Sequence, residues 1–346
     1  MKALLIGGTG QISMAITKKL VKDGWEVYLL NRGNRSAELP EGVRSIVADI
    51  NDEAAVLEKT EGMTFDSVCE FIGFVPAQVE RDWRLFRGKT RQYIYISSAS
   101  AYHKPVGDFM ITEGTALANP YWEYSRNKIA CEDFLMGKFR EEGFPVTIVR
   151  PSHTYDERNL PLGVHGAKGP WQVLKRMMEG KPVIIQGDGT SLWTMTFNRD
   201  FAIGYTGLMG NRHAIGEAFQ ITGAETLTWN QIYATIADAL GVPLNACHVS
   251  SEFLAAAGDG LGYDFTGSLI GDKAESVVFD NRKLKRVVPD MRTTVRFDQG
   301  VRIAIDHVLR HPELQVPDPE FDAWCDRVIE ALEEAKRKLQ PSASHV

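Results

Sequence analysis

A tyrosine and a lysine four residues apart form the first stretch of this sequence that could do chemistry. Residues 121–134, "YWEYSRNKIACEDF", have the composition of an amphipathic helix and contain Tyr124 and Lys128. Helical residues four positions apart lie on one face, one turn apart, so the phenol and the ammonium group would be neighbours. The ordinary pKa of tyrosine is about 10, and a neighbouring positive charge lowers it. The spacing therefore favours proton transfer by Tyr124.

A Tyr-x-x-x-Lys pair alone is a weak signal, because a chain of this composition contains about half such a pair by chance. The apolar run "QYIYI" ends in "SSASAY", which predicts that Ser97, Ser98 and Ser100 lie at the carboxyl edge of a parallel sheet. Ligands of open α/β folds bind at that edge. One of these hydroxyl groups could hold a substrate oxygen beside Tyr124.

A glycine-rich turn, "GGTGQIS", follows the first apolar run and precedes a helical pattern. Glycines in such a turn allow a close approach to a pyrophosphate, whose charge the helix N-terminus stabilises. The strand, turn and helix together predict a dinucleotide site. Ser13 occupies the third small position of the pattern, where glycine is usual. The expected cofactor contacts in this turn are Gly7, Thr9, Gly10, Gln11 and Ile12.

The end of the second apolar run, "LLNRGNR", bears on which dinucleotide binds. An acidic residue at this place holds the ribose of NAD, whereas an arginine pairs with the 2′-phosphate of NADP. Asn31 stands near the expected acid, and Arg32 and Arg35 follow it, so NADP is favoured over NAD. The alternative is that both arginines are solvated loop residues. Asp49, after the third run, is either a partner of the adenine amino group or an ordinary turn residue.

The elements that must position these residues alternate along the first part of the chain. Within residues 1–150, short apolar runs separated by helix-like segments predict a dinucleotide-binding domain with a Rossmann-like, doubly wound parallel sheet. After residue 150 the rhythm loosens, so residues 151–346 are expected to form mainly a smaller, irregular substrate-binding lobe, interleaved with the last elements of the sheet domain. Thr228 and Gln231 form a capping-box pattern for a helix that ends at Gly241. A final amphipathic helix, "FDAWCDRVIEALEEAKRKL", precedes a tail that we expect to be frayed.

The composition argues against several classes of protein. A hydrophobic content of 44% over 346 residues suits a globular enzyme. The 39 Lys and Arg residues against 45 Asp and Glu residues give a formal charge of −6, so nucleic acid is not an expected partner. The four scattered cysteines fit neither a disulfide framework nor a metal site, which favours a reducing cytoplasm and no bound metal. No run resembles a signal peptide or a membrane span, so no membrane association is expected.

Four motifs, in this order, resemble the extended short-chain dehydrogenase/reductases, and their epimerase/dehydratase branch most of all. They are "GGTGQIS", "YISSASAY", "EYSRNK" and "VRPSHTY". The resemblance covers about residues 1–240. Within this branch, "DSVCEFIGFVPAQVE" and "LNRG" are most similar to the group that contains the chloroplast stem-loop-binding proteins and their bacterial relatives.

The resemblance implies a role for each residue of the motifs. Tyr124 matches the general acid/base, Lys128 the lysine that holds the nicotinamide ribose, and Ser98 the hydroxyl that orients the substrate. The implied activity is hydride transfer between the nicotinamide and a substrate carbon. Family members often dimerise through the helix of the Tyr–Lys pair, which implies a possible homodimer. The residues that replace the usual small residues along the cofactor are Phe71, Ile72 and Gly73.

Several positions depart from the family pattern. Ala99 and Ser100 replace an Asp-Glu pair that serves elimination in family dehydratases, so sugar dehydration is not expected. Trp193 replaces an arginine that grips the diphosphate of nucleotide sugars, and Arg199 either compensates or forms a surface ion pair. His153 replaces a substrate-contacting asparagine and either binds a substrate group or is a satisfied polar histidine. The candidate substrate contacts are Ser100, His153, Trp193 and Arg199.

The leading hypothesis is an NAD(P)-dependent oxidoreductase or epimerase that acts on a hydroxyl or carbonyl group of a sugar-like or small polyol substrate. The retained Ser98, Tyr124 and Lys128 favour it. A nucleic-acid-binding protein is one alternative, suggested by the stem-loop-binding group. A regulator that binds the dinucleotide without chemistry is another, because fold resemblance does not specify function.

Overall fold

The computed structural model describes residues 1–33 and 39–340, and within it the chain divides into two compact units. The first unit consists of Met1–Asp156, Trp193–Thr226 and Ser276–Phe297. The second consists of Glu157–Leu192, Leu227–Glu275 and the chain from Asp298 on. The chain therefore returns twice to the first unit after residue 156. Two expectations lie outside the described residues: the phosphate contact of Arg35 and the frayed tail from residue 341 on.

The first unit is built on a seven-stranded sheet in the order β11-β7-β5-β4-β1-β2-β3, in which every neighbouring pair is parallel. Its strands are β1 (Lys2–Ile6), β2 (Glu26–Asn31), β3 (Arg44–Val47), β4 (Ser67–Glu70), β5 (Tyr93–Ile96), β7 (Val146–Pro151) and β11 (Ala218–Ile221). The chain moves outward from β1 to β3, crosses back to β4 and then continues outward on the other side. The predicted doubly wound parallel sheet is confirmed, and its switch point lies between β1 and β4.

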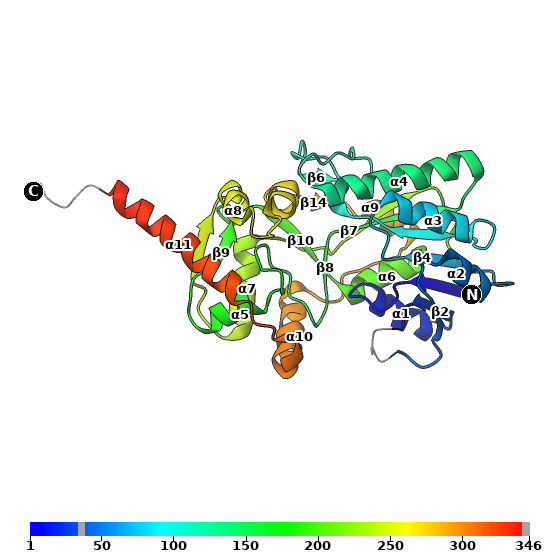
Figure 1. The fold of residues 1–346 in the computed structure, drawn as a ribbon, viewed down its shortest axis with the longest axis horizontal. Coiled ribbons are helices and arrows are strands. Elements are labelled where there is room, and N and C mark those ends of the chain that lie inside the picture. The colour runs from blue at the N-terminus through cyan, green and yellow to red at the C-terminus, as the bar shows by residue number, and fades with distance from the viewer. Residues whose placement is uncertain (34–38, 341–346) are drawn as a thin grey trace, which may run out of the picture. The chain divides into compact units, whose positions relative to one another are not determined.

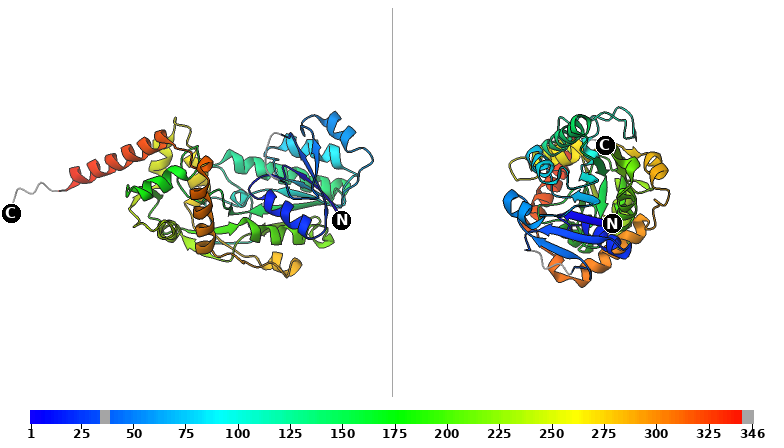
Figure 2. Two further views of the ribbon diagram at one scale, coloured as in Figure 1. Left: turned by 90° about the horizontal axis from the view of Figure 1, so that it is seen from below. Right: turned by 90° about the vertical axis from the view of Figure 1, so that its right-hand side faces the viewer.

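Helices cover both faces of this sheet (Figure 1, Figure 2). One face packs against α1 (Ser13–Lys22), α6 (Asn198–Leu208) and α9 (Arg282–Val287), and the other against α2 (Glu53–Lys59), α3 (Pro76–Phe86) and α4 (Glu123–Glu142). Ala3 and Leu5 of β1 lie in the first core, whereas Leu4 and Ile6 lie in the second. Because successive side chains of a strand point to opposite faces, a strand buried on both sides must be apolar throughout. The continuous apolar runs of the sequence have this cause.

Two smaller sheets, one of two strands and one of three, lie mostly in the first unit. The strand β6 (Met110–Ile111) pairs in parallel with β14 (Val278–Phe279), and β8 (His153–Tyr155) pairs in parallel with β10 (Leu192–Phe197). The short strand β12 (Thr226–Thr228) contains the boundary between the two units. β8 begins two residues after the end of β7, so it continues the chain directly from the edge of the main sheet.

The second unit is mostly helical. Its helices are α5 (Trp171–Met178), α7 (Trp229–Leu240), α8 (Ser251–Gly258), a π-helical segment (Thr266–Lys273), α10 (Phe297–Arg310) and α11 (Pro319–Leu339). The strands β9 (Val183–Gln186) and β13 (Ala246–Val249) form a parallel pair in this unit. The predicted capping box is confirmed, because the Thr228 hydroxyl accepts a hydrogen bond from the Gln231 N–H and Gly241 ends α7 in the left-handed conformation. Across the described ranges, no helix is both long enough and apolar enough to cross a membrane.

Candidate active site

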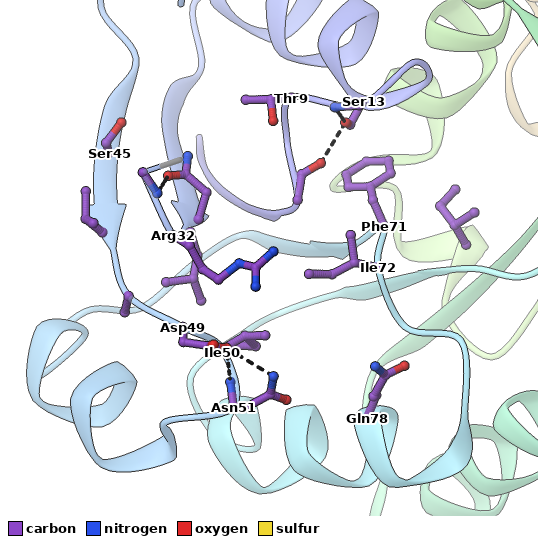
Figure 3. A pocket seen from close by; sticks show the side chains of 18 of the residues that line it. Thr9, Ser13, Arg32, Ser45, Asp49, Ile50, Asn51, Phe71, Ile72 and Gln78 are labelled. Carbon is purple, nitrogen blue, oxygen red and sulfur yellow. Dashed lines mark hydrogen bonds between the residues drawn. The ribbon is translucent and has the colours of Figure 1, made fainter. Parts of the chain in front are cut away.

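A pocket with a volume of about 630 Å3 lies at the carboxyl ends of β1, β2, β3 and β4 in the first unit (Figure 3). This is the edge of an open α/β sheet at which ligands bind, beside the switch point. Most residues that the sequence predicted as cofactor contacts line it. They are Gly7, Thr9, Gly10, Gln11, Ile12, Asn31, Arg32, Asp49, Phe71 and Ile72. Gly73, Tyr124 and Lys128, which the sequence also predicted as cofactor contacts, are not among the lining residues.

The turn between β1 and α1 keeps its shape through one serine. The Ser13 hydroxyl accepts a hydrogen bond from the Gly10 N–H and donates one to the Gly7 carbonyl, both at 2.8 Å, as Figure 3 shows in part. Gly7 has φ +81°, and a Cβ atom there would lie 2.6 Å from Cγ2 of Ile72. Only glycine satisfies both conditions. Serine at the third small position therefore closes the turn rather than merely being tolerated.

Two long-range hydrogen bonds fix the outer part of this turn. The side-chain amide of Gln11 donates to the carbonyl of Thr154 at 2.8 Å, and Asn198 donates from its side chain to the carbonyl of Gln11 at 3.1 Å. Gln11 is thus tied to the segment of β8 and to the start of α6. The start of α1 is thereby held beside the pocket, and a helix N-terminus at this place suits an anion.

The ends of β2 and β3 form the opposite part of the pocket. Asn31 accepts a hydrogen bond from the Gly33 N–H at 2.9 Å and so shapes the turn after β2. The Arg32 side chain is exposed and extends into the pocket (Figure 3). Asp49 accepts hydrogen bonds from the backbone N–H and the side-chain amide of Asn51, at 2.9 and 3.1 Å. Asp49 therefore forms a turn, as one interpretation predicted, and it also lines the pocket, where its contact with the adenine amino group stays a prediction.

Sequence reasoning missed several walls of the pocket. They are Leu30, Gly33, Leu39, Ser45, Val47, Ala48, Ile50, Asn51, Gln78, Arg81 and Ile96. Those near β3 line it because β3 pairs in parallel with β2, so the two strands end at the same edge. That neighbourhood could have been inferred from the order of the first three strands. Gln78 and Arg81 lie on α3, and no local pattern announces them.

A buried polar cluster at the end of β4 holds the loop that follows this strand. Glu70, at the end of β4, accepts a hydrogen bond from the Ile72 N–H. The Glu70 side chain is fully buried, and burial together with the neighbouring Asp82 carboxyl raises its pKa well above the ordinary value. Asp82 in turn accepts hydrogen bonds from Arg81, at 2.8 and 2.9 Å, and from the Tyr93 hydroxyl at 2.8 Å.

Gln78 of α3 also binds the backbone of this loop. Its side-chain carbonyl accepts hydrogen bonds from the N–H groups of Phe74 and Val75, at 2.6 and 3.2 Å. Because Gln78 also lines the pocket, it connects the first turn of α3 with the wall that Phe71 and Ile72 form.

The predicted helix of the Tyr–Lys pair is α4, and it brings the two side chains together. The Lys128 ammonium lies 5.7 Å from the ring centroid of Tyr124. It donates hydrogen bonds to the carbonyl groups of Gly73 at 2.7 Å and Ile96 at 2.8 Å. Burial lowers the pKa of Lys128 to about 8. The ammonium is thus held between the loop after β4 and the end of β5.

Tyr124 is half-buried and stands among aromatic rings. Its ring centroid lies 4.9 Å from that of Trp122 and 6.4 Å from that of Phe74. Lys128 also lies 4.8 Å from the Phe74 ring centroid, so the cation faces more than one aromatic ring. Tyr124 is therefore partly exposed, while Lys128 is 1% exposed.

The predicted serines follow β5, at the carboxyl edge of the sheet. Ser98 is half-buried, whereas Ser97 and Ser100 are buried. The hydroxyl of Ser100 lies 2.8 Å from that of Ser98 and accepts a hydrogen bond from Ser125 at 2.7 Å. Ser125 directly follows Tyr124 in α4, and no local pattern pointed to it.

The remaining candidates lie on β8, β10 and α6. His153 is half-buried and pairs with Met195, so the parallel strands bring the regions of His153 and Trp193 side by side. Trp193 is 3% exposed. Arg199 is exposed, and its guanidinium lies 5.4 Å from the ring centroid of Phe197. Across residues 1–33 and 39–340, no group of three or more His, Cys, Asp or Glu residues could hold a metal ion.

A match to a family model shows the family of this chain. The model described as the NAD dependent epimerase/dehydratase family matches residues 3–222. The chain belongs to the NAD-dependent epimerase/dehydratase family. The match includes the glycine turn, the serines after β5 and the Tyr–Lys pair of α4, so the resemblance of the motifs is confirmed.

Three curated relatives of this family member have different names. It is 26% identical over 255 residues to 2′-dehydrokanamycin reductase of Streptomyces kanamyceticus, covering 74% of this chain and 71% of the relative. It is also 26% identical to the chloroplast stem-loop binding protein of 41 kDa b of Arabidopsis thaliana, covering 70% of this chain and 64% of the relative. UDP-glucose 4-epimerase of Lactobacillus helveticus is 27% identical over 169 residues, covering 43% of this chain and 51% of the relative. The matched parts thus leave a third or more of two of these relatives uncovered.

Solved structures agree on the fold of this family member. An epimerase of Methanothermobacter thermautotrophicus superposes with a TM-score of 0.72 at 18% identity, covering 91% of this chain and 94% of that one. UDP-glucuronic acid 4-epimerase of Bacillus cereus, solved with UDP-glucuronic acid and NAD, has a TM-score of 0.70 at 20% identity, covering 90% and 99%. At such identities the likeness is evidence for the fold alone.

Proposed function

We propose that this protein is an NAD(P)-dependent oxidoreductase or epimerase that acts on a hydroxyl or carbonyl group of a sugar-like or small polyol substrate. The observation that carries the proposal is the position of Lys128. Its ammonium donates to Gly73 and Ile96, directly behind the loop that lines the pocket, and lies 5.7 Å from the Tyr124 ring. Tyr124, which can act as an acid or a base, and a pocket large enough for a dinucleotide therefore lie at the same edge of the sheet.

The residues of the pocket fit a dinucleotide. A Cβ atom at Gly7 would collide with Ile72, and Ser13 closes the turn that leads into α1 beside the pocket. The turn of residues 7–13 would hold the pyrophosphate, and Phe71 and Ile72 would cover one side of the cofactor. When bound, the nicotinamide gives a hydride to a substrate carbon or accepts one from it.

The chain's own residues handle the proton and the orientation. Tyr124 gives a proton to the substrate oxygen in reduction and takes it in oxidation. The Lys128 ammonium stabilises the phenolate form by charge attraction, which lowers the cost of ionising a phenol. Ser98 holds the substrate oxygen beside Tyr124. Both partners of Lys128 are backbone carbonyls, so its charge is not cancelled by an ion pair there.

The pocket also bears on cofactor choice and reaction type. Arg32 extends into the pocket near the turn of Asn31, which supports NADP over NAD. The relative named 2′-dehydrokanamycin reductase supports reduction of a carbonyl group. The relative named UDP-glucose 4-epimerase supports redox-neutral epimerisation. We favour reduction, since the NADPH preference that Arg32 supports suits a reductase.

Two measurements test the proposal. The first identifies the dinucleotide that copurifies with the protein and titrates NADH and NADPH by fluorescence. The second follows oxidation of the preferred reduced cofactor against a panel of keto sugars, and epimerisation of UDP-glucose, with wild-type protein and Tyr124→Phe. We expect Tyr124→Phe to lose turnover by about 100-fold or more and to keep nucleotide binding. Survival of turnover in this variant would remove Tyr124 from its role.

A second function is nucleic-acid binding, which the stem-loop-binding relative favours. It predicts that the protein raises the fluorescence anisotropy of a labelled RNA stem-loop, with an affinity that falls steeply with salt. Dinucleotide binding without any turnover would instead favour a redox-sensing regulator.

A homodimer through α4 is a further proposal, which light scattering coupled to size-exclusion chromatography tests directly.

A further inference from the structure

Three serine hydroxyls from two distant segments form one hydrogen-bonded chain, whose inner end is the residue that follows Tyr124. Ser98 and Ser100 belong to the turn after β5, and Ser125 belongs to the first turn of α4. The oxygen atoms of Ser98 and Ser100 lie 2.8 Å apart, and those of Ser125 and Ser100 lie 2.7 Å apart. Ser100 is 3% exposed, Ser125 is fully buried and Ser98 is half-buried. Only the Ser98 end of the chain reaches solvent.

Either hydroxyl of the Ser98–Ser100 pair could be the donor, and the number of protons in the chain favours Ser100. A hydroxyl group carries one proton and can accept two hydrogen bonds. Ser125 donates its proton to Ser100, so the proton of Ser100 is available for Ser98. Ser98 already accepts a hydrogen bond from the Ser100 N–H at 3.2 Å. With both acceptor positions of Ser98 filled from inside the protein, its own proton points outward.

We propose that Ser100 and Ser125 are positioning residues that keep Ser98 as a hydrogen-bond donor to the substrate oxygen. The inference rests on the proposed function and assigns Ser100 a role behind Ser98 rather than in contact with substrate. A donor beside Tyr124 suits an oxygen that accepts, which is a carbonyl oxygen or the alkoxide that develops from it. The buried hydroxyls also polarise one another, which strengthens the outermost donor. The site is therefore arranged to stabilise the keto form of its substrate.

The backbone supports the same arrangement. The side-chain amide of Asn119 donates to the Ser100 carbonyl at 2.8 Å, which fixes the turn after β5 on a second side. Ser125 follows Tyr124 by one residue, so the contact between Ser125 and Ser100 also fixes the start of α4 relative to this turn. The same contact thus sets the orientation of the Ser98 hydroxyl and the place of the Tyr124 backbone.

The kinetic test uses reduction of phenanthrenequinone, a small diketone, by NADPH or NADH. Ser125→Ala should lower kcat about tenfold, because one oriented hydrogen bond to the reacting oxygen is weakened, and should leave KM within about twofold. Ser125→Thr, which keeps the hydroxyl, should restore kcat. In a Ser98→Ala background, Ser125→Ala should change kcat no further, because the Ser98 hydroxyl that the chain orients is then absent. An equal fall in both backgrounds would overturn the proposal.

The control is Ser97→Ala. Ser97 is 1% exposed, adjoins Ser98, and its hydroxyl has no hydrogen-bond partner among the described residues. This variant should leave kcat unchanged. If Ser97→Ala lowers kcat as much as Ser125→Ala does, the effect belongs to general packing, and the positioning role is wrong.

A second measurement does not depend on activity. The free energy of urea unfolding is measured for Ser98→Ala, Ser125→Ala and the double variant. The two serines have no direct hydrogen bond to each other, so non-additive losses show that Ser100 connects them. Additive losses contradict the chain even in an active enzyme. The proposed function is contradicted if the wild-type protein binds dinucleotide but reduces neither the diketone nor any keto sugar. The positioning role is then wrong as well. The unfolding result still decides whether the three serines form a hydrogen-bonded chain.

Discussion

Arg150 of β7 and Glu132 of α4 form an ion pair with two hydrogen bonds, at 2.9 and 2.5 Å. Both side chains are nearly inaccessible, 6% and 4% exposed. Glu132 lies one helical turn after Lys128, so the pair fixes the rotation of α4 about its axis. A strand on one side of the active-site edge thereby determines where Tyr124 and Lys128 point.

Removing one partner of this pair should cost much stability. We expect Glu132→Ala to lower the free energy of unfolding by about 3–5 kcal/mol, because it leaves the Arg150 guanidinium buried without its carboxylate. Urea unfolding followed by circular dichroism measures the loss. Glu142→Ala, which breaks the more exposed pair with Lys138 at 2.6 Å on the same helix, is the control and should cost about 0.5 kcal/mol or less. Similar losses in the two variants would contradict the role of Arg150.

The buried Lys128 should make stability depend on pH in the alkaline range. Burial lowers its pKa from 10.5 to about 8, so the folded state releases this proton at lower pH than the unfolded state does. The contribution is present in full above pH 10.5 and is lost as pH falls through about 8. Relative to Lys128→Met, the unfolding free energy of the wild type should therefore rise across this interval. Parallel pH profiles of the two proteins would show that Lys128 keeps an ordinary pKa.

Glu70 should have an opposite effect in the acidic range. Burial and the nearby Asp82 raise its pKa above the ordinary value of 4.5, so the folded state holds this proton longer than the unfolded state does. Its contribution is complete below pH 4.5 and is lost as pH rises toward the folded pKa. Glu70→Gln, which cannot ionise, should therefore become more stable relative to wild type as pH rises from that value. Thermal unfolding at a series of pH values measures the difference.

The control for this pH effect is Glu53, whose exposed carboxylate bonds to Arg84. Its pKa is lowered, chiefly by the Arg84 hydrogen bond, so its contribution is present above the ordinary pKa and is lost on acidification. Glu53→Gln should thus shift the profile weakly and in the opposite direction. The same direction in both variants would mean that the pKa of Glu70 is lowered rather than raised in the folded protein.

Arg32 should discriminate between the two dinucleotides. Arg32→Ala should raise the Kd for NADPH by about tenfold or more, because a charge-assisted hydrogen bond to the 2′-phosphate is lost, and should change the Kd for NADH about twofold at most. Fluorescence titration at constant salt measures both constants. Arg91→Ala removes an equal charge from a residue paired with Asp66, outside the pocket, and should affect neither. Equal weakening for NADH and NADPH would make Arg32 a general contact rather than a phosphate ligand.

The sequence by itself determined those features whose cause is local. The strands of the main sheet are apolar along their whole length because both faces are covered, and this shows in the chain without further knowledge. The left-handed Gly7, the capping box of Thr228 and the spacing of Tyr124 and Lys128 are also local, since each depends on residues within one turn. The doubly wound sheet and the family of the chain were accordingly predictable.

Tertiary structure alone decided which distant segments meet at the active-site edge. Ser125 reaches Ser100 across 25 positions of sequence, and Glu132 reaches Arg150 across 18. Gln78 and Arg81 became walls of the pocket because α3 packs beside the end of β4, and Glu70 acquired its raised pKa because the same packing buries it next to Asp82. Hydrophobic periodicity reports which face of an element is buried, and it carries no information on which polar side chain will lie opposite. Those pairings arise only when the sheet order and the helix rotation bring the two partners within hydrogen-bonding distance.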